Sequence, residues 1–155
     1  MKIIITGGTL CKKYDPKTQE LVLSDCEMTN LLSGFYLNSC PEVLVWDRID
    51  SRHMDENHRQ SLYSFCLDKD ERLVVVHGTD TMELSAEYFR QQNPTGTIVF
   101  TGSWVPLVFE HSDAEFNLGF AIACAKYQPP GVYIAMGGEC LSGAKKNWDS
   151  LRFEN

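Results

Sequence analysis

The sequence has no long apolar run and no dense group of basic residues, and each absence excludes a class of partner. No segment approaches the roughly 18–20 consecutive apolar residues that a membrane span needs, so we expect no membrane partner. Lys and Arg number 14 against 21 Asp and Glu, which gives a formal net charge of −7. An acidic chain without a basic run binds phosphate backbones poorly, so we expect no nucleic-acid partner.

The cysteines and histidines also lack the spacings of a disulfide framework or a metal site. The six cysteines are scattered, without a C-x-x-C pair, at positions 11, 26, 40, 66, 124 and 140. The histidines form no H-x-x-x-H or H-E-x-x-H pattern, so we expect no metal. The opening residues MKIII are too short for the apolar part of a signal peptide. We therefore expect reduced thiols and a cytoplasmic location.

What is present is an ordinary composition in a chain of one-domain length. Hydrophobic residues make up 43% and charged residues 23% of 155 positions, close to an average soluble protein. A chain of this length buries roughly 68–70% of its unfolded surface. These values exclude a disordered tail, a collagen-like repeat and a coiled coil, and they predict a single domain over residues 1–155.

Short β-branched runs alternate with helical stretches. The expected strands are Lys2–Thr6, Val43–Asp47, Arg72–His77, Thr97–Thr101 and Val132–Met136. Nearly unbroken apolar runs are typical of parallel strands that are covered on both faces. A helix from Asp113 to about Lys126 is apolar on most sides and is expected to pack deeply. The alternation predicts an α/β fold, a doubly wound and mostly parallel sheet sandwiched by helices.

Local patterns predict where helices begin and where a hairpin lies. Capping-box patterns predict helix starts at Ser24–Glu27, Asp80–Glu83 and Ser112–Glu115. The segment Leu10–Leu23 breaks the strand–helix alternation, because Asp15-Pro16 favours a turn and Glu20–Leu23 is able to return as a strand. We expect a β-hairpin flap directly after the first strand.

Polar residues follow the carboxyl ends of the expected strands. They are Thr6-Gly7-Gly8-Thr9, Asp50-Ser51, His77-Gly78-Thr79-Asp80-Thr81, Thr101-Gly102-Ser103 and, beyond the fifth strand, Lys145-Lys146. Ligands of open α/β sheets bind outside these strand ends. The sequence therefore predicts that hydroxyl, carboxylate and ammonium groups converge at one edge of the sheet.

Each of these features also has a purely structural interpretation. Two adjacent glycines suit a tight turn, and Ser51 suits a turn as well. Asp80 suits the N-cap of the helix that follows it. His77 comes after four apolar residues and is typical of a core histidine, while Lys145 and Lys146 are typical of solvated charges.

Taken together, the groups suit hydrolysis of a small zwitterionic amide. A Thr hydroxyl becomes a nucleophile when a base or a lysine relay takes its proton. Backbone N–H groups of glycine-rich turns stabilise an oxyanion, and a carboxylate receives an α-ammonium group. The sequence lacks G-x-G-x-x-G, the P-loop pattern and the G-x-S-x-G elbow, which argues against a dinucleotide, a nucleoside triphosphate and a serine hydrolase.

The strings TGGT, HGTDTM, and TGS with Pro106, together with the segment Glu110–Leu118, resemble the bacterial-type L-asparaginase/glutaminase family over nearly the whole chain. The resemblance implies an amidohydrolase that converts L-asparagine and water into L-aspartate and ammonia, without a metal or cofactor. A glutaminase or another small-amide amidase is a close alternative. A non-catalytic sensor that binds an amino acid is the alternative from another class.

The resemblance also implies residue roles. Thr9 matches the nucleophile that forms an acyl-enzyme, and Tyr14 is the candidate that orients it. Thr79 activates water or the nucleophile, Asp80 receives the substrate α-ammonium, and Ser51 binds the α-carboxylate. The implied substrate-binding residues are Gly8, Asp50, Ser51, Gly78, Thr79, Asp80 and Ser103.

The resemblance leaves the catalytic lysine open between two positions. The family pattern Lys-x-Asn favours Lys145, whereas a one-residue shortening before Phe153 favours Lys146. A pure binder has no use for a lysine near the second threonine, so its presence favours the enzyme. Arg52 departs from the family, because many members have a small or amide side chain there.

Full-length members carry a second, smaller C-terminal domain that contributes a residue to a neighbouring subunit's site. The sequence ends at Asn155, so we expect a short-form member that corresponds to the N-terminal domain. Family members are homotetramers built from dimers, and we expect this chain to self-associate as a homodimer or homotetramer.

Overall fold

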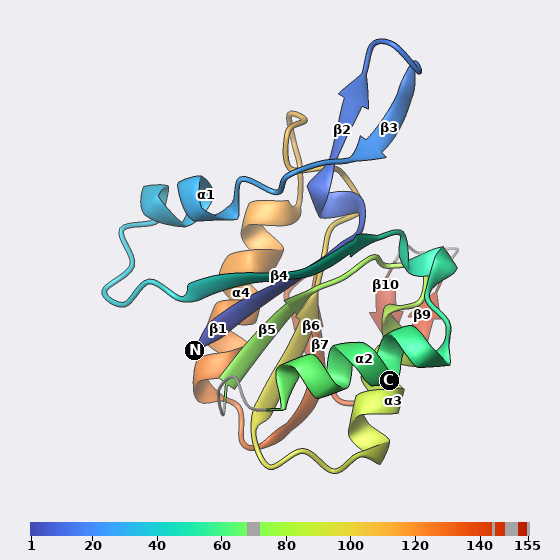
Figure 1. Ribbon diagram of the computed structural model, residues 1–155. Coiled ribbons are helices and arrows are strands. Elements are labelled where there is room, and N and C mark those ends of the chain that lie inside the picture. The colour runs from blue at the N-terminus through green and yellow to red at the C-terminus, as the bar shows by residue number, and fades with distance from the viewer. Residues whose placement is uncertain (68–71, 144, 148–151, 155) are drawn as a thin grey trace.

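The computed structural model describes residues 1–67, 72–143, 145–147 and 152–154, and its centre is a six-stranded sheet (Figure 1). The order along the sheet is β4-β1-β5-β6-β7-β8, with parallel pairing from β4 to β7 and antiparallel pairing between β7 and β8. The strands are β1 (Lys2–Gly7), β4 (Glu42–Ile49), β5 (Arg72–Val76), β6 (Thr97–Thr101), β7 (Gly131–Met136) and β8 (Glu139–Leu141). The prediction of a mostly parallel sheet is confirmed.

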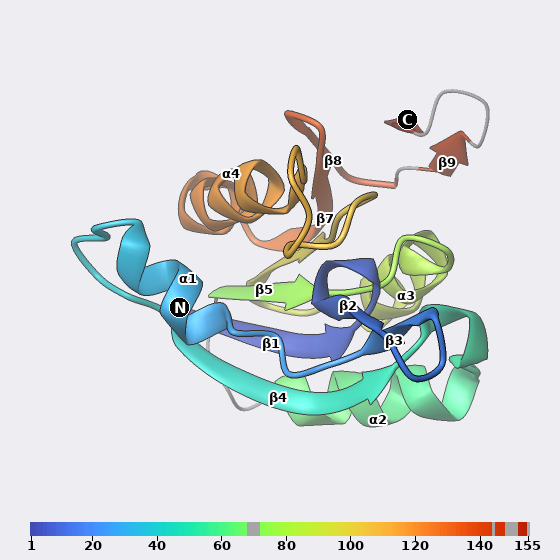
Figure 2. The same cartoon turned by 90° about the horizontal axis from the view of Figure 1, so that it is seen from above.

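Helices cover both faces of this sheet. They are α1 (Met28–Gly34), α2 (Glu56–Cys66), α3 (Met82–Gln91) and α4 (Ala114–Tyr127). Within β1, Ile3 and Ile5 pack in the same cluster as α1 and α4, whereas Ile4 packs in the cluster of α2 and α3. Figure 2 shows α4 and α2 on opposite sides of the strands. The doubly wound arrangement is therefore confirmed, because alternate strand residues point to opposite faces.

The hairpin predicted after the first strand is present. β2 (Lys12–Asp15) pairs antiparallel with β3 (Glu20–Leu23), and the pair projects beyond the main sheet (Figure 1). The Asp15 side chain accepts from the backbone N–H of Lys17 at 2.9 Å, as expected for an Asp before a turn. A second small sheet pairs β9 (Lys145–Asn147) with β10 (Arg152–Glu154). None of the described helices is long and apolar enough to cross a bilayer.

Two of the three predicted helix starts are confirmed, because α3 begins at Met82 and α4 at Ala114, but the N-cap residues differ from the expected ones. The residues before α1, α3 and α4 are Glu27, Thr81 and Asp113, and none of these side chains bonds to its own helix as a cap. The Ser112 hydroxyl accepts from the backbone N–H of Ala114 at 3.1 Å, at the start of α4, whereas Ser24 and Asp113 bond elsewhere. The Ser24 hydroxyl donates to the Cys11 carbonyl at 3.0 Å, and Asp113 accepts from two backbone N–H groups of the preceding loop.

A capping box does occur at α2, where the sequence pattern is less familiar. Asp55 accepts from the backbone N–H of His58 at 2.9 Å, and the His58 ring bonds back to the Asp55 backbone N–H at 3.3 Å. Histidine here takes the place of the Glu or Gln that the usual pattern requires. Which side chains cap a helix therefore depends on the hydrogen-bond partners that the fold places near the helix start.

Two short 3₁₀ helices, Thr9–Cys11 and Ser51–His53, follow the carboxyl ends of β1 and β4. The chain runs from β1 to β4 on one side and then returns to β5 on the other side of β1. The direction of winding thus changes between β1 and β5. This is the topological switch point, where open α/β sheets bind their ligands.

The turns after β1 and β5 touch backbone to backbone at this switch point. Gly8 has a φ of +82°, and a Cβ atom built on it lies 2.5 Å from the Gly78 nitrogen and 2.6 Å from the Gly78 Cα. The Thr6 hydroxyl donates to the Val76 carbonyl at 2.9 Å, which ties the ends of the two strands together. No residue larger than glycine fits at position 8 without moving one of the turns.

We expect Gly8→Ala to lower the free energy of unfolding by at least about 2 kcal/mol, because it combines a positive φ with a backbone clash. Gly119→Ala is the matched control, since Gly119 is exposed on α4 and nothing lies within 4 Å of its built Cβ. Alanine in a helix stabilises by about 0.5–1 kcal/mol relative to glycine. Thermal unfolding checks both, and equal midpoints for the two variants would contradict the close contact.

Candidate active site

The segment that holds Thr9 is shaped by two glycines. Gly7 has a φ of +108°, and a Cβ atom on it lies 2.7 Å from the Ile49 carbonyl oxygen at the end of β4. Gly8 follows with its contact to the turn after β5. Thr9 then begins the 3₁₀ helix, and its side chain is partly exposed. The two tight turns therefore place Thr9, as a partly exposed residue, at the switch point.

The segment His77–Thr81 follows β5 and meets the turn after β4. Thr79 is buried, whereas the Asp80 side chain is one-third exposed. The Thr81 hydroxyl donates to the Ser51 carbonyl at 2.8 Å, so the two turns are joined directly. Thr81, not Asp80, occupies the N-cap position of α3, and the interpretation of Asp80 as that N-cap is wrong.

Ser51 lies within this junction with its hydroxyl unsatisfied. A Cβ atom on Gly78 lies 2.4 Å from Ser51 Oγ, so the hydroxyl rests against the glycine of the neighbouring turn. Among the buried side-chain nitrogen and oxygen atoms of the described residues, Ser51 Oγ alone has no hydrogen-bond partner. A buried unpaired polar group costs about 1–3 kcal/mol. Such a group is a candidate for pairing with a ligand.

Asp50, the residue before Ser51, is the centre of a charge cluster. The Arg52 side chain bonds to both carboxylate oxygens of Asp50, with Nε–Oδ1 at 3.0 Å and Nη2–Oδ2 at 2.8 Å. Lys12 Nζ, at the base of the hairpin, donates to Asp50 Oδ2 at 3.1 Å. The bonds from Arg52, followed by those from Lys12, hold the pKa of Asp50 well below its usual range. Asp50 is thus ionised and fixed in place.

His77 is fully buried beneath the second turn and joins a chain of hydrogen bonds. Its Nδ1 lies 2.8 Å from the Gly78 carbonyl, which only accepts, so Nδ1 carries the proton. Its Nε2 then accepts from the Ser85 hydroxyl at 2.9 Å, and Arg59 Nε donates to the same hydroxyl oxygen at 3.2 Å. Burial lowers the pKa of His77 to about 4. The interpretation of His77 as a core histidine is confirmed.

The remaining predicted site residues differ in location and burial. Tyr14 lies in β2 and is about half exposed. Ser103 is fully buried and donates to the Val105 carbonyl at 2.7 Å, so its proton holds the loop after β6. Lys145 is an exposed residue of β9. The side chain of Lys146 lies outside the described part of the structure.

Sequence reasoning missed the partners that hold this site. Lys12 is 38 positions from Asp50, and Arg59 is 26 positions from Ser85. Neither pair belongs to a recognisable motif. The only signal for Arg52 was its departure from the family pattern. No group of three or more His, Cys, Asp or Glu that could hold a metal occurs among the residues that the structure describes.

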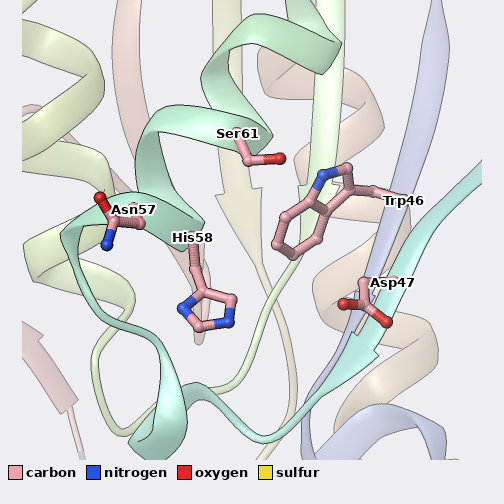
Figure 3. Close-up of a pocket in the computed structure, with 5 residues that line it drawn as sticks. All are labelled: Trp46, Asp47, Asn57, His58 and Ser61. Atoms are coloured by element: carbon pink, nitrogen blue, oxygen red, sulfur yellow. The ribbon is translucent and has the colours of Figure 1, made fainter.

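A separate hollow of about 370 Å³ lies between β4 and α2. Figure 3 shows the side chains around it, and they are Trp46, Asp47, Asn57, His58 and Ser61. His58 is already engaged with Asp55 in the capping box of α2. The hollow is lined by residues of β4 and α2 and by none of the strand-end turns of the candidate site.

The family described as "Asparaginase, N-terminal" matches residues 1–149 of the chain. The chain belongs to the asparaginase family. L-asparaginase I from Vibrio cholerae has a similar structure, with a TM-score of 0.82 and 25% identity over 99% of this chain and 50% of that protein. The thermostable L-asparaginase from Thermococcus kodakarensis superposes with a TM-score of 0.75 and 25% identity, over 92% of this chain and 46% of that one.

Curated relatives of this asparaginase-family chain carry two different names. The L-asparaginase of Thermococcus kodakarensis is 36% identical over 80 residues, which are 50% of this chain and 24% of that protein. A glutamyl-tRNA(Gln) amidotransferase subunit from Metallosphaera sedula is 30% identical over 90% of this chain and 34% of its own length. The chain thus spans about a third or less of these two relatives.

The buried His77 predicts a specific pH dependence of stability. Its pKa is about 4 in the folded state and 6.5 in the unfolded chain, so the unfolded chain binds more protons between these values. Its contribution is fully present above pH 6.5 and is lost as the pH falls to 4. We expect a loss of about 3 kcal/mol in the free energy of unfolding over this range.

Denaturant unfolding at several pH values between 4 and 7 measures this loss. His77→Asn keeps a donor for the Gly78 carbonyl but does not titrate, so its stability should change much less over this range. His53→Asn is the control, because His53 is exposed and should leave the slope intact. An unchanged slope in His77→Asn refutes the assignment. The ionised Asp50 loses its contribution only below pH 3.8, outside this range.

Proposed function

We propose that this chain is an amidohydrolase that converts L-asparagine and water into L-aspartate and ammonia. The Thr9 hydroxyl attacks the side-chain amide carbon, ammonia leaves, and an acyl-enzyme ester joins the substrate to Thr9. Water then hydrolyses the ester, releases aspartate and restores the hydroxyl. Thr79, with a lysine from β9, passes the proton of the Thr9 hydroxyl to the departing nitrogen in the first step. In the second step it passes a proton from water to the Thr9 oxygen.

The observation that carries this proposal is the contact between the turns after β1, β4 and β5. Gly8 lies against Gly78, and Gly78 lies against the Ser51 hydroxyl. Thr9 and Thr79 each directly follow one of these touching glycines. Two threonines and the Ser51 hydroxyl are thereby held in neighbouring turns. Family membership and a similar chain named L-asparaginase support the same reaction.

The polar groups around the threonines suit the two ends of an amino acid. The unpartnered Ser51 hydroxyl gains a hydrogen bond if it donates to an α-carboxylate, and this removes the cost of its burial. Asp80 is partly exposed and supplies a carboxylate for an α-ammonium group. Backbone N–H groups of the two glycine turns supply candidate donors for the oxyanion.

Glutamine is the second candidate substrate. Its support comes from the curated relatives that are named as a glutamyl-tRNA(Gln) amidotransferase subunit and align with most of this chain. An amidotransferase needs an amide donor, and glutamine differs from asparagine by one methylene. A single methylene in a pocket changes specificity by only about 10- to 200-fold. Both amides therefore belong in the first assay.

Ammonia release from asparagine and glutamine tests the proposal. We expect Thr9→Ala to lower kcat by at least about 1,000-fold, because the acyl-enzyme cannot form without the hydroxyl. Thr29→Ala makes the same chemical change at an exposed position of α1 and should leave the rate unchanged. If wild type releases no more ammonia than Thr9→Ala while asparagine still raises its melting temperature, the enzyme proposal fails and a sensor remains.

Single substitutions distinguish the roles of Lys145 and Lys146, the two lysines of β9. Adjacent residues of a strand point to opposite faces of the sheet, so only one of them is expected to reach Thr79. We expect one of Lys145→Met and Lys146→Met to lower kcat by at least about 100-fold and the other to retain near-normal activity. Steady-state ammonia release measures both. Equal residual activity in the two variants rules out a lysine relay.

A further inference from the structure

The Arg52 guanidinium lies beside the carboxylate proposed to receive the substrate α-ammonium. Arg52 Nε is 4.0 Å from Asp80 Oδ2, while two bonds to Asp50 fix the orientation of the guanidinium. The Arg52 side chain is 62% exposed, whereas that of Asp80 is 33% exposed. The guanidinium is therefore the more solvent-exposed member of this pair.

Arg52 changes the balance of charge around the site. Lys12 already pairs with Asp50, so Asp50 has a cation without Arg52. The four groups Lys12, Asp50, Arg52 and Asp80 together carry two positive and two negative charges. An α-ammonium that approaches Asp80 therefore meets a cation that is already present. Like charges at such short range repel each other, most strongly where a ligand excludes water.

Arg52 also offers donors for an anion. A guanidinium has five N–H groups, and the bonds to Asp50 use one on Nε and one on Nη2. The remaining N–H groups match the two oxygens of a carboxylate. The unpartnered Ser51 hydroxyl, on the adjacent residue, is a further donor. Arg52 and Ser51 together favour a ligand with a carboxylate over one with an ammonium.

We propose that Arg52 determines substrate specificity, and that the site prefers side-chain amides that carry a carboxylate but no free α-ammonium group. Succinamate, which is asparagine without its α-amino group, represents this class, and N-acylated asparagine is a second member. The inference rests on the proposed function for the reaction itself. Succinamate and water give succinate and ammonia by the same attack of Thr9. The residue acts by selecting the ligand and takes no part in bond breaking.

Binding of the two products tests this inference without requiring turnover. Titration calorimetry with succinate and with L-aspartate is carried out on wild type, Arg52→Ser, Arg52→Lys and the control Arg90→Ser. Arg90 is in the last turn of α3 and pairs with Glu87, so its substitution removes one positive charge outside the site. Succinate should bind wild type more tightly than aspartate does. The ratio of the two affinities should fall at least about fivefold in Arg52→Ser and stay unchanged in Arg90→Ser.

Arg52→Lys keeps the charge without the two-bond geometry and should show an intermediate ratio. The ratio of kcat/KM for succinamate to that for asparagine should follow the same order across the variants. A ratio of affinities that Arg52→Ser leaves unchanged, or that favours aspartate in wild type, overturns the inference. So does a failure of both compounds to bind any variant. If the binding ratio shifts as expected but no amide releases ammonia, the reaction proposal fails and the role of Arg52 stands.

Discussion

The direct contact between Gly8 and Gly78 is the constraint on which the rest of the candidate site depends. A Cβ atom on Gly8 would lie 2.5 Å from the Gly78 nitrogen, and one on Gly78 would lie 2.4 Å from Ser51 Oγ in the turn after β4. The chain winds in opposite directions on the two sides of β1, and this opens the sheet edge at the switch point. Glycines let the turns after β1 and β5 approach each other there. The proposed nucleophile Thr9, and Thr79 with Asp80, then follow within two residues of these glycines.

Some side chains around the contact form hydrogen bonds within the fold, whereas others remain available to bind a ligand. Thr6 and Thr81 use their hydroxyl protons on the carbonyls of Val76 and Ser51, and so join neighbouring turns. Burial keeps His77 neutral, and its Nδ1–H donates to the Gly78 carbonyl. The Ser51 hydroxyl and the exposed N–H groups of Arg52 stay uncommitted. These structural bonds are made within the protein itself and need no ligand.

Much of the fold could be predicted because apolar periodicity is a strong local signal. The five parallel strands, the hairpin and the long helix after β6 were all expected from their residues. Helix caps were not predictable in the same way, since the Ser24 hydroxyl bonds to the Cys11 carbonyl and Asp113 bonds to the loop before its helix. A short polar side chain satisfies the nearest available partner, and only the folded chain defines which partner that is.

The sequence by itself determined which chemical groups stand at the strand ends, because each follows an apolar run typical of a strand. Tertiary structure alone decided which groups meet and which remain unpaired. Ser51 and Ser103 look alike in the sequence, as serines in turns after parallel strands. In the fold Ser103 gives its proton to the Val105 carbonyl, whereas Ser51 is buried against Gly78 without a partner. The difference arises because hydrogen bonds form between neighbours in space, and those neighbours come from distant parts of the chain.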